Sequence, residues 1–275
     1  MKQSVSSMRA RLQSEVRTSL RMLALAGTVL ALACMPVADA LSHSSARTPS
    51  SSAGSITTRS TLLTHISAAP VTTQNSSPAV LPCTPVAMPH PTTLDLTLAP
   101  AGVSQLTEPT EYYTIYGNDA LTLQQQIAHC APGSSASNLA EFTAQTAYNL
   151  TWQYGTTVFD DGTCQAGNVK IGVHTQTVLP SWQPGTDATP GLAARWSNFA
   201  AALAVHEQGH ASLAADYAGQ ILADVSAVPV QSCDTLTSTL NAVIQNDAAG
   251  LSAASERYDT QTNHGATQGA VLPTN

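Results

Sequence analysis

The segment His206-Glu207-Gln208-Gly209-His210 constrains this chain most, because its side chains can act together only on an α-helix. Residues four apart on a helix lie one above the other, so the imidazoles of His206 and His210 can reach one metal ion. Glu207 is offset toward the open side of that ion, where it can take a proton from water and pass it to a leaving amine. The H-E-x-x-H pattern therefore predicts a helix that binds zinc through both histidines and uses Glu207 as its catalytic residue.

The residues on both sides of this segment indicate the same helix, over about 191–225. Two histidines beside a carboxylate inside a core are costly without a cation, and only 10% of this chain is charged. The alternative is a pair of core histidines satisfied by hydrogen bonds. Gly209 costs about 1 kcal/mol relative to Ala inside a helix, so we expect its space to be needed, either by a strand that crosses closely or for substrate access. Apolar residues and the two histidines recur every three or four positions on the inward face: Trp196, Phe199, Leu203, His206, His210, Leu213 and Tyr217.

A catalytic zinc ion needs a third protein ligand, which we expect after a second helix predicted within 231–258. His264 is the preferred candidate because the glycine that follows it lets the chain turn back, and Glu256 is the alternative. Tyr258 is expected to donate a hydrogen bond to an oxyanion, and Asp259 to orient a ligand imidazole. Packing for Tyr258 and helix capping for Asp259 are the competing interpretations.

The chain before residue 190 has the pattern of β-strands. A short helix is predicted over 121–129, and the two longer helices come only after residue 190. Strands followed by helices predict an α+β domain over 93–275. Polar and apolar residues alternate, as in strands, in four segments: 93–98, 111–116, 146–154 and 169–178.

Charge excludes one class of partner. After residue 92, Lys170, Arg195 and Arg257 are the basic residues beside fifteen acidic ones. Such an acidic surface repels phosphate backbones, so we do not expect nucleic-acid binding.

The first 40 residues have the features of a secretory signal. Five basic residues among the first 21 are followed by an apolar stretch, Met22 to Val37, and by Ala38-Asp39-Ala40. Cleavage is expected after residue 40. A retained membrane anchor is the alternative, although the stretch is shorter than the roughly 20 residues needed to span a bilayer. Lipidation at Cys34 is a third interpretation.

Residues 41–92 are rich in Ser, Thr, Ala and Pro and lack a periodic apolar pattern. We interpret them as a disordered stalk. The mature protein is therefore expected to be secreted or held at the cell surface, without a membrane span, and to be a monomer. In an oxidising compartment its four cysteines, Cys83, Cys130, Cys164 and Cys233, are expected to form two disulfides, for which three pairings are possible.

Together these motifs resemble a bacterial family of predicted secreted zinc-dependent proteases that is catalogued as a domain of unknown function. The resemblance covers roughly residues 93–269. It rests on an ordered set in which the third and fifth elements are the most specific: Thr146-Ala147-x-x-Leu150-Thr151-Trp152; Cys164 with the strand at 169–178 and Leu179-Pro180-x-Trp182; Trp196 with His206-Glu207-Gln208-Gly209-His210; Cys233; and Tyr258-Asp259-x-x-Thr262-x-His264-Gly265.

The resemblance implies a zincin-like fold, with a sheet edge above the active helix. It implies that His206 and His210 are zinc ligands, that Glu207 is the catalytic acid and base, and that His264 is the matching histidine of the second motif. It also favours a disulfide between Cys164 and Cys233, which leaves Cys83 with Cys130.

The resulting expectation is a secreted zinc metallopeptidase that hydrolyses peptide or protein substrates with a zinc-activated water. The strand at 169–178 is expected to be the sheet edge that pairs with extended substrate. His174 on that strand could face either the cleft or solvent. The alternatives are a non-catalytic surface protein with a structural zinc ion and an adhesion module without metal.

Overall fold

The structure is a computed structural model that describes residues 59–64, 83, 86–134, 142–188 and 190–274, and only the backbone of 59–64. The expected export signal, Cys34 and much of the expected stalk lie outside these residues. None of the described helices is long and apolar enough to cross a membrane.

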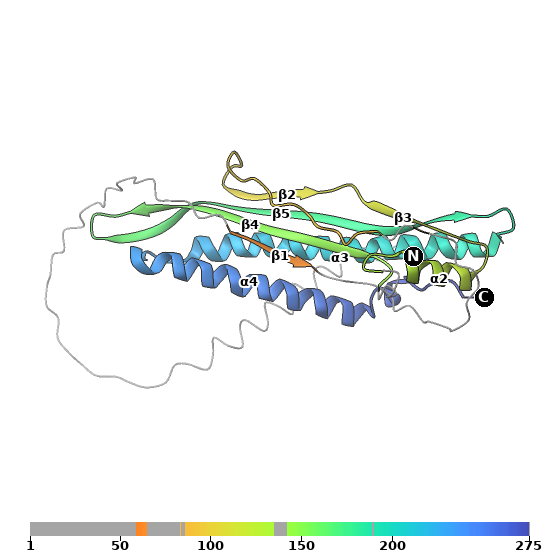
Figure 1. Cartoon of the computed structure of the whole chain (residues 1–275). Helices are drawn as coiled ribbons and strands as arrows, with labels where there is room; N and C mark the ends of the chain where they lie inside the picture. The colour runs from red at the N-terminus through yellow and green to blue at the C-terminus, as the bar shows by residue number, and fades with distance from the viewer. Residues whose placement is uncertain (1–58, 65–82, 84–85, 135–141, 189, 275) are drawn as a thin grey trace, which may run out of the picture. The chain divides into compact units, whose positions relative to one another are not determined.

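A mixed β-sheet is built around one long antiparallel hairpin (Figure 1). Strand β4 (Gln145–Val158) pairs with β5 (Thr163–Pro184), and β1 (Arg59–Thr64) pairs antiparallel with β4. On its other side, β5 pairs in parallel with β2 (Gly102–Thr107) and β3 (Glu111–Gly117), and antiparallel with the short β6 (Gln231–Ser232). Because β5 has partners on both sides, the expectation that the strand at 169–178 is a sheet edge is wrong.

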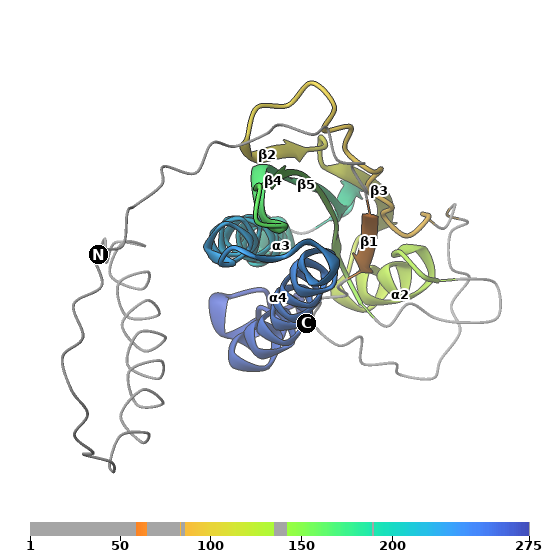
Figure 2. The same ribbon diagram turned by 90° about the vertical axis from the view of Figure 1, so that its left-hand side faces the viewer.

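Two long antiparallel helices lie together on one side of this sheet (Figure 2). Helix α3 (Pro190–Ala227) carries the H-E-x-x-H segment, and α4 (Cys233–Thr262) is followed by the 3₁₀ turn η1 (Ala266–Gln268). The shorter α2 (Ala120–Cys130) follows β3. The α+β fold class and both long helices are confirmed, as are the strands predicted at 111–116, 146–154 and 169–178.

The main core lies between the sheet and the two long helices. Alternate residues of β4 and β5 point toward the helices, as period-two apolar patterns require. Apolar residues of α3 and α4 meet them at helical spacing. The buried residues of this core include Tyr148, Leu150, Trp152, Ile171 and Val173 from the strands, Ala214, Ala218, Ile221 and Val225 from α3, and Leu236, Leu240, Ile244 and Leu251 from α4.

The opposite face of the sheet is crossed by residues 86–98, which have no regular secondary structure, so the strand predicted at 93–98 is wrong. Side chains of the sheet donate hydrogen bonds to backbone carbonyl groups of this segment, which a strand would use to pair with a neighbouring strand. Lys170 Nζ donates to Leu96 O at 2.9 Å, and His174 Nδ1 donates to Thr92 O at 2.7 Å. His174 is 1% exposed and its Nε2 lies 2.9 Å from Glu108 Oε1, so it faces neither a cleft nor solvent.

Parts of the segment expected to be a stalk belong to the domain. Residues 59–64 pair with β4, and Val86 packs against a second core formed by α2, β3 and the start of α3. Cys83 forms a disulfide with Cys130 at the end of α2, with Cα atoms 5.8 Å apart.

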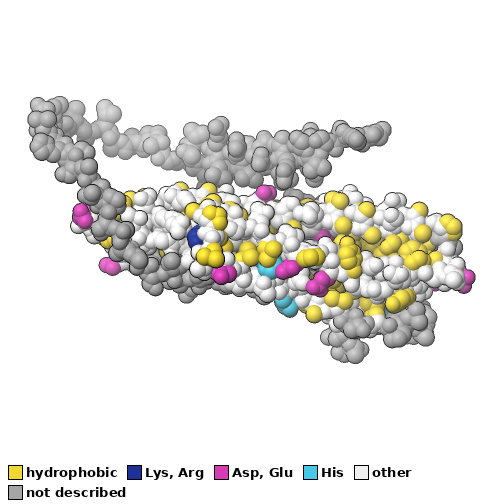
Figure 3. Space-filling view, turned by 90° about the horizontal axis from the view of Figure 1, so that it is seen from above, with side chains coloured by type: hydrophobic (Ala, Val, Ile, Leu, Met, Phe, Trp, Pro, Cys, Tyr) yellow, Lys and Arg dark blue, Asp and Glu magenta, His cyan; other side chains and the backbone are white. Residues whose placement is uncertain are grey.

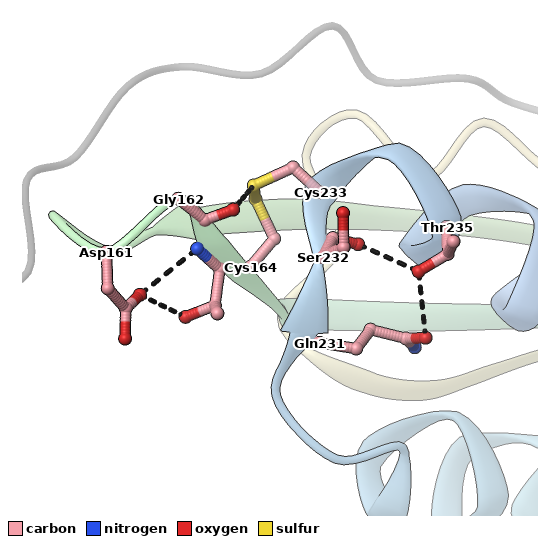
Figure 4. The surroundings of a disulfide bond; sticks show 8 residues. Asp161, Gly162, Cys164, Gln231, Ser232, Cys233 and Thr235 are labelled. Atoms are coloured by element: carbon pink, nitrogen blue, oxygen red, sulfur yellow. Dashed lines mark hydrogen bonds between the residues drawn. A yellow bond between two sulfur atoms is a disulfide. The ribbon is translucent and has the colours of Figure 1, made fainter.

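The second disulfide joins the β4–β5 hairpin to the start of α4 (Figure 4). Cys164 and Cys233 are bonded, with Cα atoms 4.8 Å apart, so the pairing implied by the family resemblance agrees with the structure. Asp161 Oδ1 accepts a hydrogen bond from Thr163 N at 3.1 Å and so stabilises the hairpin turn beside the disulfide. On the molecular face shown in Figure 3, charged side chains are sparse and mostly acidic.

Candidate metal centre

Helix α3 places the three motif side chains in the interior. His206, Glu207 and His210 are each 0% exposed. The two imidazole rings lie 4.9 Å apart between centroids, with an interplanar angle of 87°. Because four residues make about one helical turn, both rings project from the same face toward α4.

Helix α4 brings a carboxylate to both rings. Asp259 Oδ1 lies 3.1 Å from His206 Nε2 and 3.0 Å from His210 Nε2, and the residue is 4% exposed. Among the described residues, His206, His210 and Asp259 form the one group of three whose ligand atoms all lie within 4.8 Å of one another. Asp259, which the sequence suggested as an orienting residue, thus occupies the position expected of a third ligand.

His264, the residue predicted as third ligand, lies at the rim of this group. Its Nδ1 is 3.9 Å from Asp259 Oδ1, and its side chain is 37% exposed. Glu256, the alternative, is exposed on α4 and does not belong to the group.

Nδ1 of each imidazole, the ring nitrogen that does not face Asp259, lies within hydrogen-bond distance of a polar side chain. His206 Nδ1 donates to Gln268 Oε1 at 2.9 Å, since an amide oxygen can only accept, and His210 Nδ1 lies 2.9 Å from Ser255 Oγ. Protonation of Nδ1 leaves Nε2 with a lone pair in the neutral ring. Such contacts fix the tautomer and orientation of metal-binding histidines.

Tyr258 completes the packing around the histidines. Its ring stacks on the His206 ring, with centroids 4.9 Å apart and an interplanar angle of 10°. Its hydroxyl donates to His206 O at 3.3 Å and accepts from Gln268 Nε2 at 3.0 Å. A Cβ atom on Gly209 would overlap the Tyr258 hydroxyl and ring, which explains the glycine inside the helix. Burial raises the pKa of Tyr258, although the hydrogen bond from Gln268 opposes this.

Glu207 is held on one side and unpaired on the other. Its Oε2 accepts a hydrogen bond from Thr146 Oγ1 on β4 at 2.7 Å, and Thr146 Oγ1 lies 2.9 Å from Thr177 Oγ1. Its Oε1 is buried without a hydrogen-bond partner. Burial, together with the charge of Asp259, raises the pKa of Glu207 to about 8, while the Thr146 hydrogen bond acts in the opposite direction.

This donor set fits a divalent cation such as zinc. Two imidazole nitrogens and one carboxylate oxygen are common zinc ligands, and a fourth position would remain for water or substrate. The three ligand atoms are close enough together for one ion to contact all of them. A cation would also offset the charge of the buried carboxylate groups.

Three contributors to this centre were missed by the sequence reasoning: Thr146, Ser255 and Gln268. Ser255 could have been found, because it precedes Asp259 by four residues on α4 and so shares its face. Thr146 begins the first motif of the family resemblance, but nothing in that motif places it beside the metal centre, which it reaches from β4. Gln268 reaches the centre from η1 and lies outside the motifs.

A family model matches the part of the chain that carries this centre. Residues 110–265 match the family described as bacterial protein of unknown function (DUF922). The chain belongs to this family. The matched region contains His206, His210, Asp259 and His264, and it ends before Gln268. No curated protein and no solved structure matches the chain.

Proposed function

We propose that the protein is a secreted zinc-dependent metallopeptidase. The observation that carries this proposal is the meeting of His206 Nε2, His210 Nε2 and Asp259 Oδ1 beside a glutamate whose second oxygen is buried and unpaired. Zinc bound there would act as a Lewis acid toward a water molecule and the substrate carbonyl group.

Glu207 would move the proton during hydrolysis. The charge of a zinc ion at this site would favour the ionised form of Glu207 over the protonated form that burial favours. The carboxylate takes a proton from the attacking water, whose oxygen then bonds to the carbonyl carbon of the peptide. When the carbon–nitrogen bond breaks, Glu207 returns the proton to the leaving amine. The hydrogen bond from Thr146 occupies Oε2 and leaves the other oxygen, Oε1, without a hydrogen-bond partner, so Oε1 is the atom we assign to proton transfer.

The two disulfides support the proposal that the mature domain works outside the cytoplasm. The basic and apolar N-terminal segment would direct its export. The substrate is a peptide or protein chain, but β5 is not the strand that holds it, since both edges of β5 are paired.

Glu207→Gln tests the proposal because glutamine keeps the shape of the side chain and cannot accept the proton. The variant should bind one zinc ion per chain, as measured by metal analysis, and should lose peptide hydrolysis by about 10²–10⁴-fold. Glu256→Gln, an exposed change on α4, is the matched control and should retain activity. Hydrolysis by Glu207→Gln at the parent rate would contradict the mechanism.

The complete burial of both histidines also favours a second candidate, in which zinc only stabilises the domain. Structural zinc sites contribute directly to folding free energy. On this alternative, chelation should lower the melting temperature of the parent and of Glu207→Gln equally, and neither protein should hydrolyse peptides.

A further inference from the structure

His264 differs from the other residues of the metal centre in its exposure. His206 and His210 are 0% exposed and the Asp259 side chain 6%, whereas the His264 side chain is 37% exposed. Its Nδ1 atom is nevertheless buried and lacks a hydrogen-bond partner. The ring therefore extends from solvent to the edge of the centre, with one nitrogen directed inward. This is the position of a group that meets an entering molecule.

The backbone around His264 holds the ring in this place. Asn263, His264 and Gly265 have φ angles of 48°, 49° and 81°. Left-handed backbone costs roughly 1–2 kcal/mol for a residue with a side chain. His264 N donates to Asp259 O at 2.8 Å, and Gly265 N donates to Thr262 Oγ1 at 3.2 Å. These contacts maintain a strained turn directly after the helix that carries Asp259.

Gly265 lets this turn approach the metal centre. A Cβ atom at this position would lie 3.0 Å from His206 Cγ, so only glycine allows such close contact without displacement. The ring of Phe142, just before β4, is an aromatic neighbour of His264, with ring centroids 6.2 Å apart.

Two distances separate the roles of His264 and Asp259. Asp259 Oδ1 is within 3.1 Å of both Nε2 atoms, but His264 Nδ1 is 3.9 Å from Asp259 Oδ1 and lies outside the group of converging ligand atoms. Nδ1 is therefore adjacent to the ligands without being one of them. A donor at Nδ1 could reach a molecule that enters past the half-buried His264 ring to the edge of the group.

We propose that His264 is a catalytic residue that donates a hydrogen bond from Nδ1–H to the carbonyl oxygen of a peptide substrate, while Asp259 is the third metal ligand. This inference rests on the proposed peptidase function. The carbonyl oxygen gains negative charge when the water oxygen bonds to the carbonyl carbon. A donor aimed at that oxygen stabilises the transition state more than the ground state.

Two substitutions at His264 test the hydrogen-bond donor while both accept the left-handed backbone of the turn. His264→Gly accepts the left-handed backbone and removes the donor. His264→Asn tolerates the same backbone and carries an amide N–H near the position of Nδ1. The zinc-loaded parent, both variants and Asp259→Ala are compared by zinc affinity in a chelator competition, by melting temperature, and by kcat and KM on an unfolded protein substrate.

His264→Gly should keep the parent zinc affinity within about threefold and lose roughly 10²–10³-fold in kcat, the loss typical of one oxyanion donor. His264→Asn should recover much of that loss. Asp259→Ala should weaken zinc binding by at least about 100-fold.

Zinc loss by His264→Gly as large as that of Asp259→Ala would make His264 a ligand and overturn the proposal. Unchanged kcat in His264→Gly beside an active parent would also overturn it while leaving the peptidase function standing. An inactive zinc-loaded parent would overturn both.

Discussion

Helices α3 and α4 share one contact surface but have two different interiors. Toward the Cys164–Cys233 disulfide, most of their buried residues are apolar, among them Ile221, Leu236 and Leu240. At the other end, the same two helices bury His206, His210, Ser255, Asp259 and Thr262 against one another. The sheet covers both regions, and at the polar end η1 also contributes Gln268 beside His206.

The two interiors contribute in opposite ways to stability. Burying a Leu or Ile side chain stabilises the fold by about 1.5–3 kcal/mol. Burying a carboxylate or an imidazole costs free energy unless a partner or a cation compensates. The apolar end therefore supports a polar end that would not be stable by itself, and each region can be changed while the other is monitored.

Leu240→Ala is expected to have the largest effect on stability. Leu240 is 0% exposed in the apolar interior, so its truncation leaves a cavity and should cost roughly 2–5 kcal/mol. Urea denaturation of the metal-free protein measures this loss, and zinc stoichiometry of the folded variant should not change. Thr237→Ala, an exposed change on the same helix, should lie within about 0.5 kcal/mol of the parent. Loss of zinc binding by folded Leu240→Ala would show that the two interiors are not separable.

Gly209→Ala should destabilise the polar end by roughly 1–3 kcal/mol, because the added methyl group overlaps Tyr258. It should also weaken zinc binding, because Tyr258 stacks on His206. Gly219 lies in the same helix with open space around its Cβ position, so Gly219→Ala should instead stabilise by up to about 1 kcal/mol. Urea denaturation of both variants measures the change in the free energy of unfolding. If the two changes had the same sign, the prediction would be wrong.

Ser255→Ala should weaken zinc binding by about 10–100-fold, because Ser255 Oγ lies 2.9 Å from Nδ1 of His210, a ligand in the proposed site. The melting temperature of the metal-free protein should change little by comparison. Ser252→Ala, a half-buried change one turn earlier on α4, is the control. Chelator competition measures both affinities, and identical values for the two variants would argue against an orienting role for Ser255.

Asp247→Asn should have the smallest effect and should depend on pH. Burial, with the charge of Asp224 on α3, raises the pKa of Asp247. The folded protein therefore binds more protons than the unfolded chain. As the pH rises through and above the ordinary pKa of an aspartate, the ionised Asp247 destabilises the fold. The variant should be more stable than the parent at pH 7 and equally stable at pH 3, as measured by urea denaturation. Asp224→Asn should act in the same direction, and the double variant should gain less than the sum of the two.

The helix of the candidate site and its buried face could be predicted because their sequence pattern is local. The spacing of His206 and His210 requires a helix, and the same periodicity located its buried face. The position of β5 in the sheet could not be predicted in this way, because alternation along a strand reports its faces and does not report its neighbours. Residues 93–98 alternate like a strand, but Lys170 and His174 bind their carbonyl groups from the sheet.

By itself, the sequence determined the H-E-x-x-H helix, the α+β order of elements and the second motif that faces it. Only the tertiary structure decided that Asp259 lies between the two Nε2 atoms and that His264 lies at the rim. These two residues are five apart in sequence, and a left-handed turn after α4 separates their positions. Short motifs specify which groups are available, but the packing of α4 against α3 determines which atoms meet, because it depends on contacts such as Tyr258 against Gly209 that are distant in sequence.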